Sequence, residues 1–76
     1  MSAFKKFEEL VKRLDKLRVP YDIKHVREGS LLIVVATPGK RWEVEVMEDG
    51  SLEVEIFISS GVRSTKDLAE LYRELQ

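Results

Sequence analysis

Several residue types that support common kinds of protein chemistry are missing from this sequence or nearly so. It has no cysteine, which excludes disulfides and thiolate metal ligands, and His25 is its single histidine. A zinc site or a histidine-based nucleophile pair would need a second such residue. No apolar run reaches the ~20 residues of a membrane span, and the N-terminus lacks the apolar core of a signal peptide. We therefore expect a cytoplasmic protein that is not an enzyme and has no cofactor and no metal.

The chain also has no strong excess of charge of one sign, since the net charge is −1. Composition thus gives no electrostatic reason to expect binding to nucleic acid or to a membrane. What is abundant is apolar and charged residues, at 43% and 36%, which is typical of a globular chain. Asparagine is absent and Gln76 is the single glutamine. A thermostable natural protein and an engineered or de novo protein would both have this composition, and both readings stay open.

The length of 76 residues predicts one domain, 1–76, near the lower limit for a single hydrophobic core. The central feature is residues 41–58, where apolar and acidic residues alternate on either side of Asp49-Gly50. This pattern predicts a β-hairpin. A three-residue loop, Glu48 to Gly50, would place Val46 opposite Leu52, with Gly50 in the left-handed region as a G1 bulge.

The flanking segments predict the order helix, four strands, helix. Apolar residues recur at helical spacing over residues 2–18, at Phe4, Phe7, Leu10, Val11, Leu14 and Leu17. Strands are expected at 21–27 and 30–37, and a second helix is expected from Ser64, with Asp67 in a capping-box position. The fold class is therefore α+β, an antiparallel meander in the order 1-2-3-4. Both helices should cover the sheet face that carries Trp42, Val44, Val54 and Ile56.

The segment Leu31–Ala36 is apolar without a break, which is typical of a strand covered on both faces. A two-residue turn at Glu28-Gly29 would pair Ile23 with Val34. This register assigns Leu32, Val34 and Ala36 to the helix-covered face and points the alternate residues of the strand away from the helices. The side chains then expected on the uncovered face are Val26, Leu31, Ile33, Val35, Met47 and Phe57. A soluble monomer seldom leaves such a patch in water, so we expect an interface, most simply of a homodimer. The alternatives are helices on both faces or a register shifted by one residue.

The same uncovered face should carry four glutamates, in two cross-strand pairs of like charge: Glu43, Glu45, Glu53 and Glu55. They are either a solvated face that discourages aggregation or an acidic patch that meets a basic partner. A second copy could supply such a partner through Lys24, Arg27, Lys40 and Arg41. A divalent cation site is disfavoured, because strands lack the looped carbonyl ligands that calcium prefers.

The hairpin also carries a resemblance. The run KRWEVEVMEDGSLEVEIF, preceded by the helix FKKFEELVKRLDKLRVPY, resembles small uncharacterised bacterial proteins of the αββββα kind, some of which look like immunity or toxin-neutralising proteins. The resemblance is specific around Arg41–Glu45 and Asp49–Ser51, and it brings no catalytic residues. It implies a non-enzymatic binding module acting by protein–protein contact, whose partner is a second copy or another protein. The alternative is an engineered scaffold, a redesigned version of such a protein with no biological partner.

Overall fold

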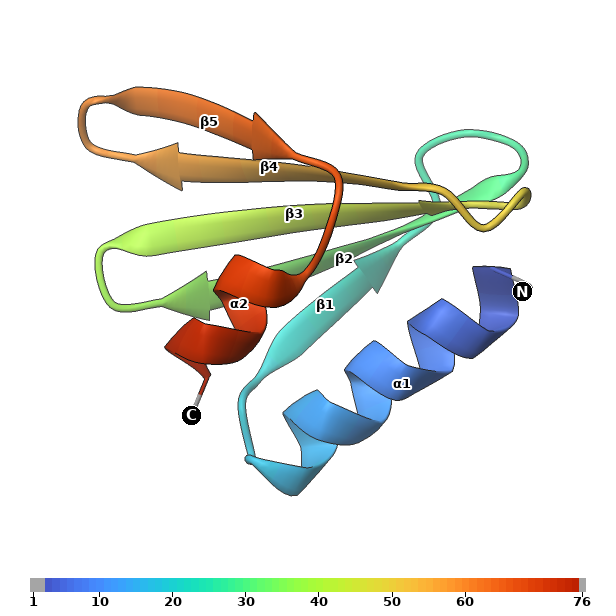
Figure 1. Cartoon of the computed structure of the whole chain (residues 1–76), viewed down its shortest axis with the longest axis horizontal. Coiled ribbons are helices and arrows are strands. Elements are labelled where there is room, and N and C mark those ends of the chain that lie inside the picture. The colour runs from blue at the N-terminus through green and yellow to red at the C-terminus, as the bar shows by residue number, and fades with distance from the viewer. Residues whose placement is uncertain (1–2, 76) are drawn as a thin grey trace.

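The chain folds as a five-stranded antiparallel sheet with two helices on one of its faces (Figure 1). The computed structural model describes residues 3–75, with side chains from Lys5 on. Its elements are α1 (Ala3–Lys16), β1 (Tyr21–Lys24), β2 (Ser30–Thr37), β3 (Lys40–Met47), β4 (Leu52–Ile58), β5 (Gly61–Thr65) and α2 (Ala69–Glu74). The strands follow the sheet in chain order. The predicted α+β class and meander are confirmed, but the sheet has five strands and not four. Within residues 3–75, no helix is long and apolar enough to cross a membrane.

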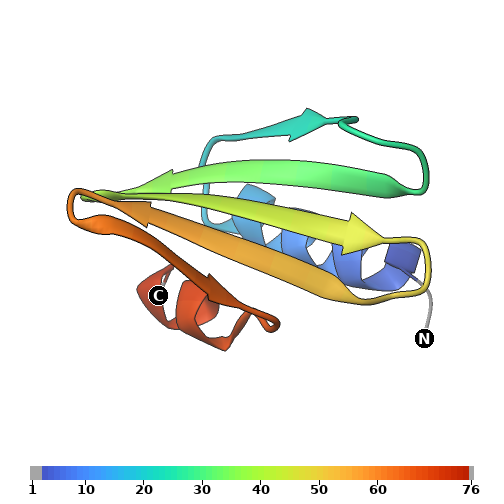
Figure 2. The ribbon, with the colours of Figure 1, turned by 90° about the horizontal axis from the view of Figure 1, so that it is seen from above.

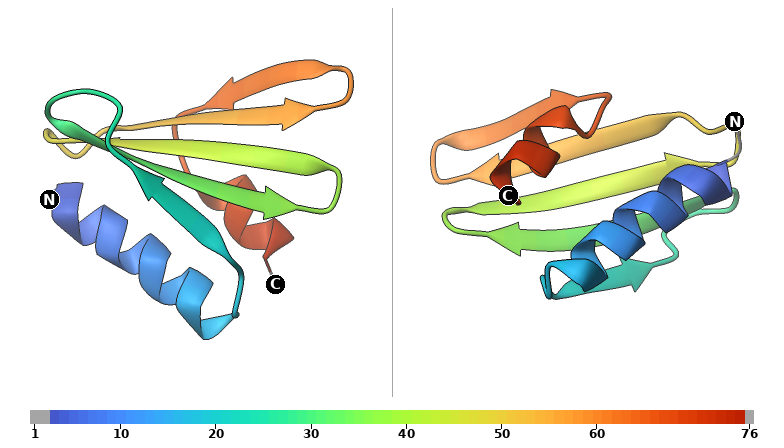
Figure 3. Two further views of the ribbon diagram at one scale, coloured as in Figure 1. Left: turned by 180° about the vertical axis from the view of Figure 1, so that it is seen from behind. Right: turned by 60° about the horizontal axis from the view of Figure 1, so that its bottom comes forward.

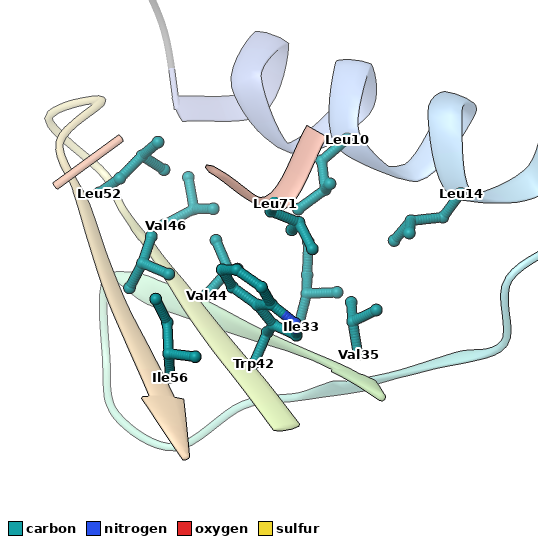
Figure 4. Packing of buried hydrophobic residues seen from close by; sticks show 11 residues of the cluster. Leu10, Leu14, Ile33, Val35, Trp42, Val44, Val46, Leu52, Ile56 and Leu71 are labelled. Atoms are coloured by element: carbon teal, nitrogen blue, oxygen red, sulfur yellow. The ribbon is translucent and has the colours of Figure 1, made fainter. Parts of the chain in front are cut away.

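Both helices lie on the same face of the sheet, as predicted (Figure 3). Leu10 and Leu14 of α1 and Leu71 of α2 are fully buried against the side chains that the sheet turns toward them. Figure 4 shows these leucines around Trp42, which lies at the middle of the cluster. The buried residues of the sheet are Ile33, Val35, Trp42, Val44, Val46, Leu52, Val54 and Ile56. The single core therefore fills the space between one sheet face and the helix layer.

The apolar stripe predicted for the first helix packs on the core through Phe7, Leu10, Val11 and Leu14. The prediction is wrong for Leu17, which follows the last residue of α1 and is 43% exposed. The side chain of Phe4 lies outside the described part.

The helix ends in a Schellman motif. Val19 N–H donates to the Leu14 carbonyl at 2.9 Å and Arg18 N–H to the Asp15 carbonyl at 3.1 Å. Arg18 takes a positive φ of 58°, a position where glycine is usually found. Val19 then packs against the core and leads the chain through Pro20 into β1.

The central hairpin has the predicted register and turn. Val46 pairs with Leu52 and Val44 with Val54. Gly50 has a φ of 90°, and its N–H donates to the Met47 carbonyl at 2.9 Å. Met47 N–H in turn donates to the Ser51 carbonyl at 2.9 Å, which is the hydrogen bonding of a three-residue loop with a G1 bulge. The side chain of Asp49 accepts bonds from the backbone and hydroxyl of Ser51 and holds the turn closed.

The predicted register between β1 and β2 is wrong by one residue. Ile23 pairs with Ile33 and Lys24 with Leu32, not Ile23 with Val34. The expected turn does form, since Ser30 N–H donates to the Arg27 carbonyl. However, the ladder pair nearest to this turn is Lys24 with Leu32. Lys24 lies three residues before Arg27, whereas Leu32 lies two residues after Ser30. The β1 side of the connection therefore carries one extra residue. That residue reverses the two faces of β2 relative to the prediction.

The segment after β4 also differs from the prediction. Ser59-Ser60 is a tight turn, because Ile58 pairs with Gly61, and the chain continues as the edge strand β5. Ser64, expected to begin the second helix, lies in this strand opposite Glu55. Asp67 still acts at the helix start, where its side chain accepts the Ala69 N–H at 3.0 Å. The apolar face predicted for α2 is confirmed: Leu71 is buried, and Leu68, Tyr72 and Leu75 pack around the core.

Candidate functional site: the open face of the sheet

The face of the sheet opposite the helices carries a mixed set of side chains, here called the open face. Figure 2 looks onto the sheet from this side, with α1 behind it. Strand pairing and alternation place its members in columns. The columns are Asp22 and Lys24 on β1; Ser30, Leu32, Val34 and Ala36 on β2; Arg41, Glu43, Glu45 and Met47 on β3; Glu53, Glu55 and Phe57 on β4; and Val62 and Ser64 on β5. One apolar column therefore lies beside two acidic columns.

The predicted interface is partly overturned by this arrangement. Ile33 and Val35 have no exposed surface, because they pair with Val44 and Trp42 on the helix-covered side. Leu31 pairs with Val46 on that side too and is 36% exposed at its margin. The physical reason is the extra residue in the β1–β2 connection. Three other predicted positions do lie on the open side: Met47, Phe57, and Val26 in the connection, which is 56% exposed. Leu32, Val34 and Ala36 were predicted to lie in the core. In the structure they point to the open face instead, in place of Leu31, Ile33 and Val35.

The four predicted acidic residues do come together. Glu43 pairs with Glu55 and Glu45 with Glu53, so the carboxylates form two directly opposed pairs at the centre of the open face. Like charges placed opposite each other on adjacent strands are unfavourable. We call these four residues the glutamate grid.

Arg27 neutralises one corner of the grid. Its guanidinium donates two hydrogen bonds to the Glu45 carboxylate, at 2.8 and 3.1 Å, and the Ser30 hydroxyl donates a third at 2.7 Å. The Arg27 hydrogen bonds, and then that of Ser30, hold the pKa of Glu45 below its ordinary value. The same contact raises the pKa of Arg27. The ion pair forms where the chain has left the ladder: residues 25–27 are outside β1, and Arg27 reaches across to Glu45 of β3.

The two strands of the grid differ in how fully their charge is balanced. On β3, Glu43 lies 2.9 Å from the Arg41 guanidinium and Glu45 is bound by Arg27. On β4, Glu53 lies 4.0 Å from Arg27 with its side chain 56% exposed. Within the described range, Glu55 has no cation within 4.0 Å. The negative charge of the open face is therefore concentrated on β4.

A hollow of about 450 Å³ lies over this part of the sheet. Its lining combines all four grid glutamates with apolar and hydroxyl groups: Val26, Leu32, Glu43, Glu45, Glu53, Val54, Glu55, Ser64, Thr65 and Lys66. Its volume lies within the range of about 300–1,000 Å³ that is usual for ligand pockets. Of residues 3–75, no group of three or more His, Asp or Glu side chains is arranged to hold a metal ion.

The remaining predicted residues lie elsewhere. Lys40, predicted among the cations with which a second copy could meet the acidic patch, is on the opposite face, where its ammonium donates to Glu74 of α2 at 2.7 Å. His25 is exposed in the β1–β2 connection. Trp42 is a core residue, as its phase predicts, and Tyr21 is half-buried with its hydroxyl donating to Asp15 at 2.9 Å. Lys40, Tyr21 and Trp42 thus contribute to the packing of the helices on the sheet, and the open face remains the candidate site.

A second groove, of about 520 Å³, lies between the two helices on the other side of the molecule. Arg13 stacks on the Tyr72 ring there at 4.1 Å from the centroid, which ties α1 to α2. Glu9, Lys12, Lys16 and Leu17 complete its lining. Its cations are spaced along one solvated helix face, so the groove has a structural explanation and the open face remains the stronger candidate.

Comparisons with protein-family models, with curated proteins and with solved structures found no match to this chain.

Proposed function

We propose that this protein is a non-enzymatic binding module that acts by protein–protein contact, with the open face of its sheet as the binding surface. The observation that carries the proposal is the composition of β2. On β3 and β4 the residues that point away from the helices are mainly charged. On β2 the corresponding residues are Ser30 at the start of the strand and then three apolar residues, Leu32, Val34 and Ala36. A strand that is apolar on both sides is normally covered on both sides, and no element of residues 3–75 covers this one.

The first partner that we propose is a second copy of this chain, packed sheet on sheet. A two-fold axis along β2 would bring the apolar columns of two copies together and leave the glutamate grids toward the margins. A stable dimer buries about 800 Å² of each partner. That is roughly a sixth of the 5079 Å² accessible surface, an area that one face of a five-stranded sheet can supply. An immunity-like module, which the resemblance of the hairpin implies, would use the same face to cover its partner.

Light scattering at several protein concentrations tests self-association, with Val34→Lys as the variant. Val34 lies between Asp22 and Glu43 on the neighbouring strands, so the fold of the monomer can accommodate a lysine there. The substitution should therefore disrupt the apolar contact between two copies without unfolding the monomer. Leu17→Lys is the matched control, because Leu17 is 43% exposed at the far end of α1. We expect a dimer for the wild type and the control and a monomer for Val34→Lys. A dimer that survives Val34→Lys, or a wild type that stays monomeric at millimolar concentration, would contradict the proposal.

A further inference from the structure

We infer that the outer edge of β1 is a docking site for a second copy of this chain, whose own β1 adds to it antiparallel about a two-fold axis through Ile23. The inference goes beyond the proposed function, because it uses a margin of the sheet and not its open face. It extends the five-stranded sheet from one copy into the next through backbone hydrogen bonds.

Strand β1 ends the sheet on one side, and within residues 3–75 no strand pairs with its outer edge (Figure 2). In an antiparallel strand, successive residues turn their N–H and C=O groups to opposite sides, so alternate residues of Tyr21–Lys24 point these groups away from β2. Such a row of unpaired groups is a template for another strand. The side chains that the edge carries then determine which strand can add to it.

The apolar core is left open at this edge. Ile23 lies on the helix-covered side opposite Ile33, but it is 47% exposed, whereas Ile33 has no exposed surface. Of the described residues, four of the five large apolar side chains that are exposed lie in β1, in its connections or on the strand next to it: Leu17, Ile23, Val26 and Leu31. An apolar side chain from an added strand would cover Ile23 and continue the core across the edge.

The two charged residues of β1 are available to a partner. Asp22 and Lys24 flank Ile23 and lie on the open side with opposite charges. Neither of them forms an ion pair within the described part of the chain. The other edge of the sheet differs, because Arg63 of β5 already donates to the Glu70 carboxylate at 2.6 and 3.2 Å.

The pleat limits how two copies of β1 can pair. Residues directly opposite each other share a face, so a two-fold axis perpendicular to the sheet has to pass through a residue position and not between two residues. An axis at Asp22 or at Lys24 would place like charges opposite each other. An axis at Ile23 places Ile23 against Ile23 of the second copy, and it places Asp22 opposite Lys24 of the second copy twice by symmetry. The register centred on Ile23 is therefore self-complementary, since opposite charges across two strands attract.

The contact is small, because β1 has four residues. It buries much less than the roughly 800 Å² that each partner of a stable dimer buries. The edge pair is therefore expected to be weak, so light scattering at micromolar concentration should not detect it. A method that traps a short-lived complex is needed to test it.

Disulfide trapping of single-cysteine variants is such a method, since the chain has no cysteine of its own. In Ile23→Cys the two thiols would lie opposite each other on the axis, where the Cα atoms of an antiparallel pair are about 4.5–5.5 Å apart, as a disulfide requires. Val62→Cys is the matched control, because Val62 is an apolar residue on the other edge strand and is 54% exposed. We expect Ile23→Cys to form a linked dimer roughly tenfold faster than Val62→Cys under mild oxidation, because pairing raises the effective concentration of the thiols. The sheet-on-sheet dimer cannot give this product, since Ile23 lies on the helix-covered side, so the two proposals fail independently.

Charge variants in the Ile23→Cys background test the register. Asp22→Lys places lysines opposite each other in both pairs and should slow trapping by roughly two- to tenfold. Adding Lys24→Asp exchanges the two charges, restores opposite pairs and should return the rate to within about twofold of the Ile23→Cys rate. Glu8→Lys, an exposed position on α1, makes the same change of net charge away from the edge and should leave the rate unchanged. Equal trapping of Ile23→Cys and Val62→Cys, or a charge exchange that is as slow as Asp22→Lys alone, would overturn the inference.

Discussion

The hydroxyl of Thr37 should be among the most important polar groups for stability, and Thr37→Val tests this. The hydroxyl accepts a hydrogen bond from the indole N–H of Trp42 at 2.8 Å and donates one to the Glu74 carboxylate at 3.0 Å. It therefore connects the centre of the core to the last turn of α2, where Lys40 also bonds Glu74. Valine has nearly the same shape as threonine, so the substitution removes the hydroxyl and leaves the packing in place.

The cost follows from burial. Trp42 has no exposed surface, so water cannot replace the lost acceptor, and an unsatisfied buried donor costs about 1–3 kcal/mol. Loss of the bond to Glu74 adds about 1 kcal/mol. We expect a total loss of about 2 to 4 kcal/mol, which is a large part of the roughly 4–11 kcal/mol that a chain of this length can have. With an m-value of about 1 kcal/mol/M, the urea midpoint should fall by about 2 M or more.

The assay is urea unfolding followed by tryptophan fluorescence, which is specific because Trp42 is the single tryptophan. Thr37→Ser keeps the hydroxyl and should recover most of the lost stability. Thr65→Val is the matched control, since Thr65 is a half-buried strand threonine. If Thr37→Val stays within 0.5 kcal/mol of the wild type, or if Thr37→Ser is as unstable as Thr37→Val, the reasoning is refuted.

Two further predictions concern other parts of the fold. The pKa of Glu74 is lowered by its hydrogen bond from Lys40, and that of Glu45 by its hydrogen bonds from Arg27. Because each contact stabilises the ionised carboxylate, its contribution should be complete above the ordinary glutamate pKa of about 4.3 and lost as the pH falls through the lower values of the folded state. Urea unfolding between pH 7 and pH 2.5 measures this, and a flat profile would contradict it. Arg18→Gly should stabilise the protein by about 0.5 to 1 kcal/mol, because glycine adopts the positive φ of 58° without strain. Thermal unfolding checks this against Arg18→Ala, which keeps the strain and should give no gain.

The central hairpin could be predicted in detail because its signals are local. Alternation assigns the faces of β3 and β4, and Asp49-Gly50 determines the loop within a few residues of both strands. The apolar stripe of α1 was equally clear, since one helix buries one side. In both cases the residues that decide the structure are neighbours in the sequence.

The register of β1 depends on a contact that the sequence does not display. Arg27 and Glu45 are 18 residues apart, and their bond accompanies the extra loop residue that shifts β1 against β2. A usable signal was nevertheless present at Pro38-Gly39. A two-residue turn there pairs Thr37 with Lys40 and so places Val35 opposite Trp42 in the core, as observed. The Pro38-Gly39 turn joins longer strands than the turn at Glu28-Gly29 does, so it predicts the faces of β2 better.

Strand β5 was missed because its sequence also fits a helix start. Ser64 and Asp67 have capping-box spacing, and this masked the alternation of Val62 and Ser64 with Arg63 and Thr65. Arg63 on the helix side then bonds Glu70 at 2.6 and 3.2 Å, which joins the edge strand to α2. A short polar edge strand is stabilised by such contacts more than by its own pattern, so sequence periodicity finds it poorly.

The corrected register changes what the open face can bind. Had Ile33 and Val35 pointed outward, the face would have been largely apolar and suited to one permanent interface. Instead it has an apolar column on β2 beside unbalanced charge on β4, and these two halves respond differently to salt. Contact between apolar columns is little affected by ionic strength, whereas contact with Glu53 and Glu55 is screened. A salt series on the wild-type protein therefore tests the proposed sheet-on-sheet dimer without any substitution: an association that persists at high salt is expected for the apolar column of β2, and one that is lost at high salt would contradict it.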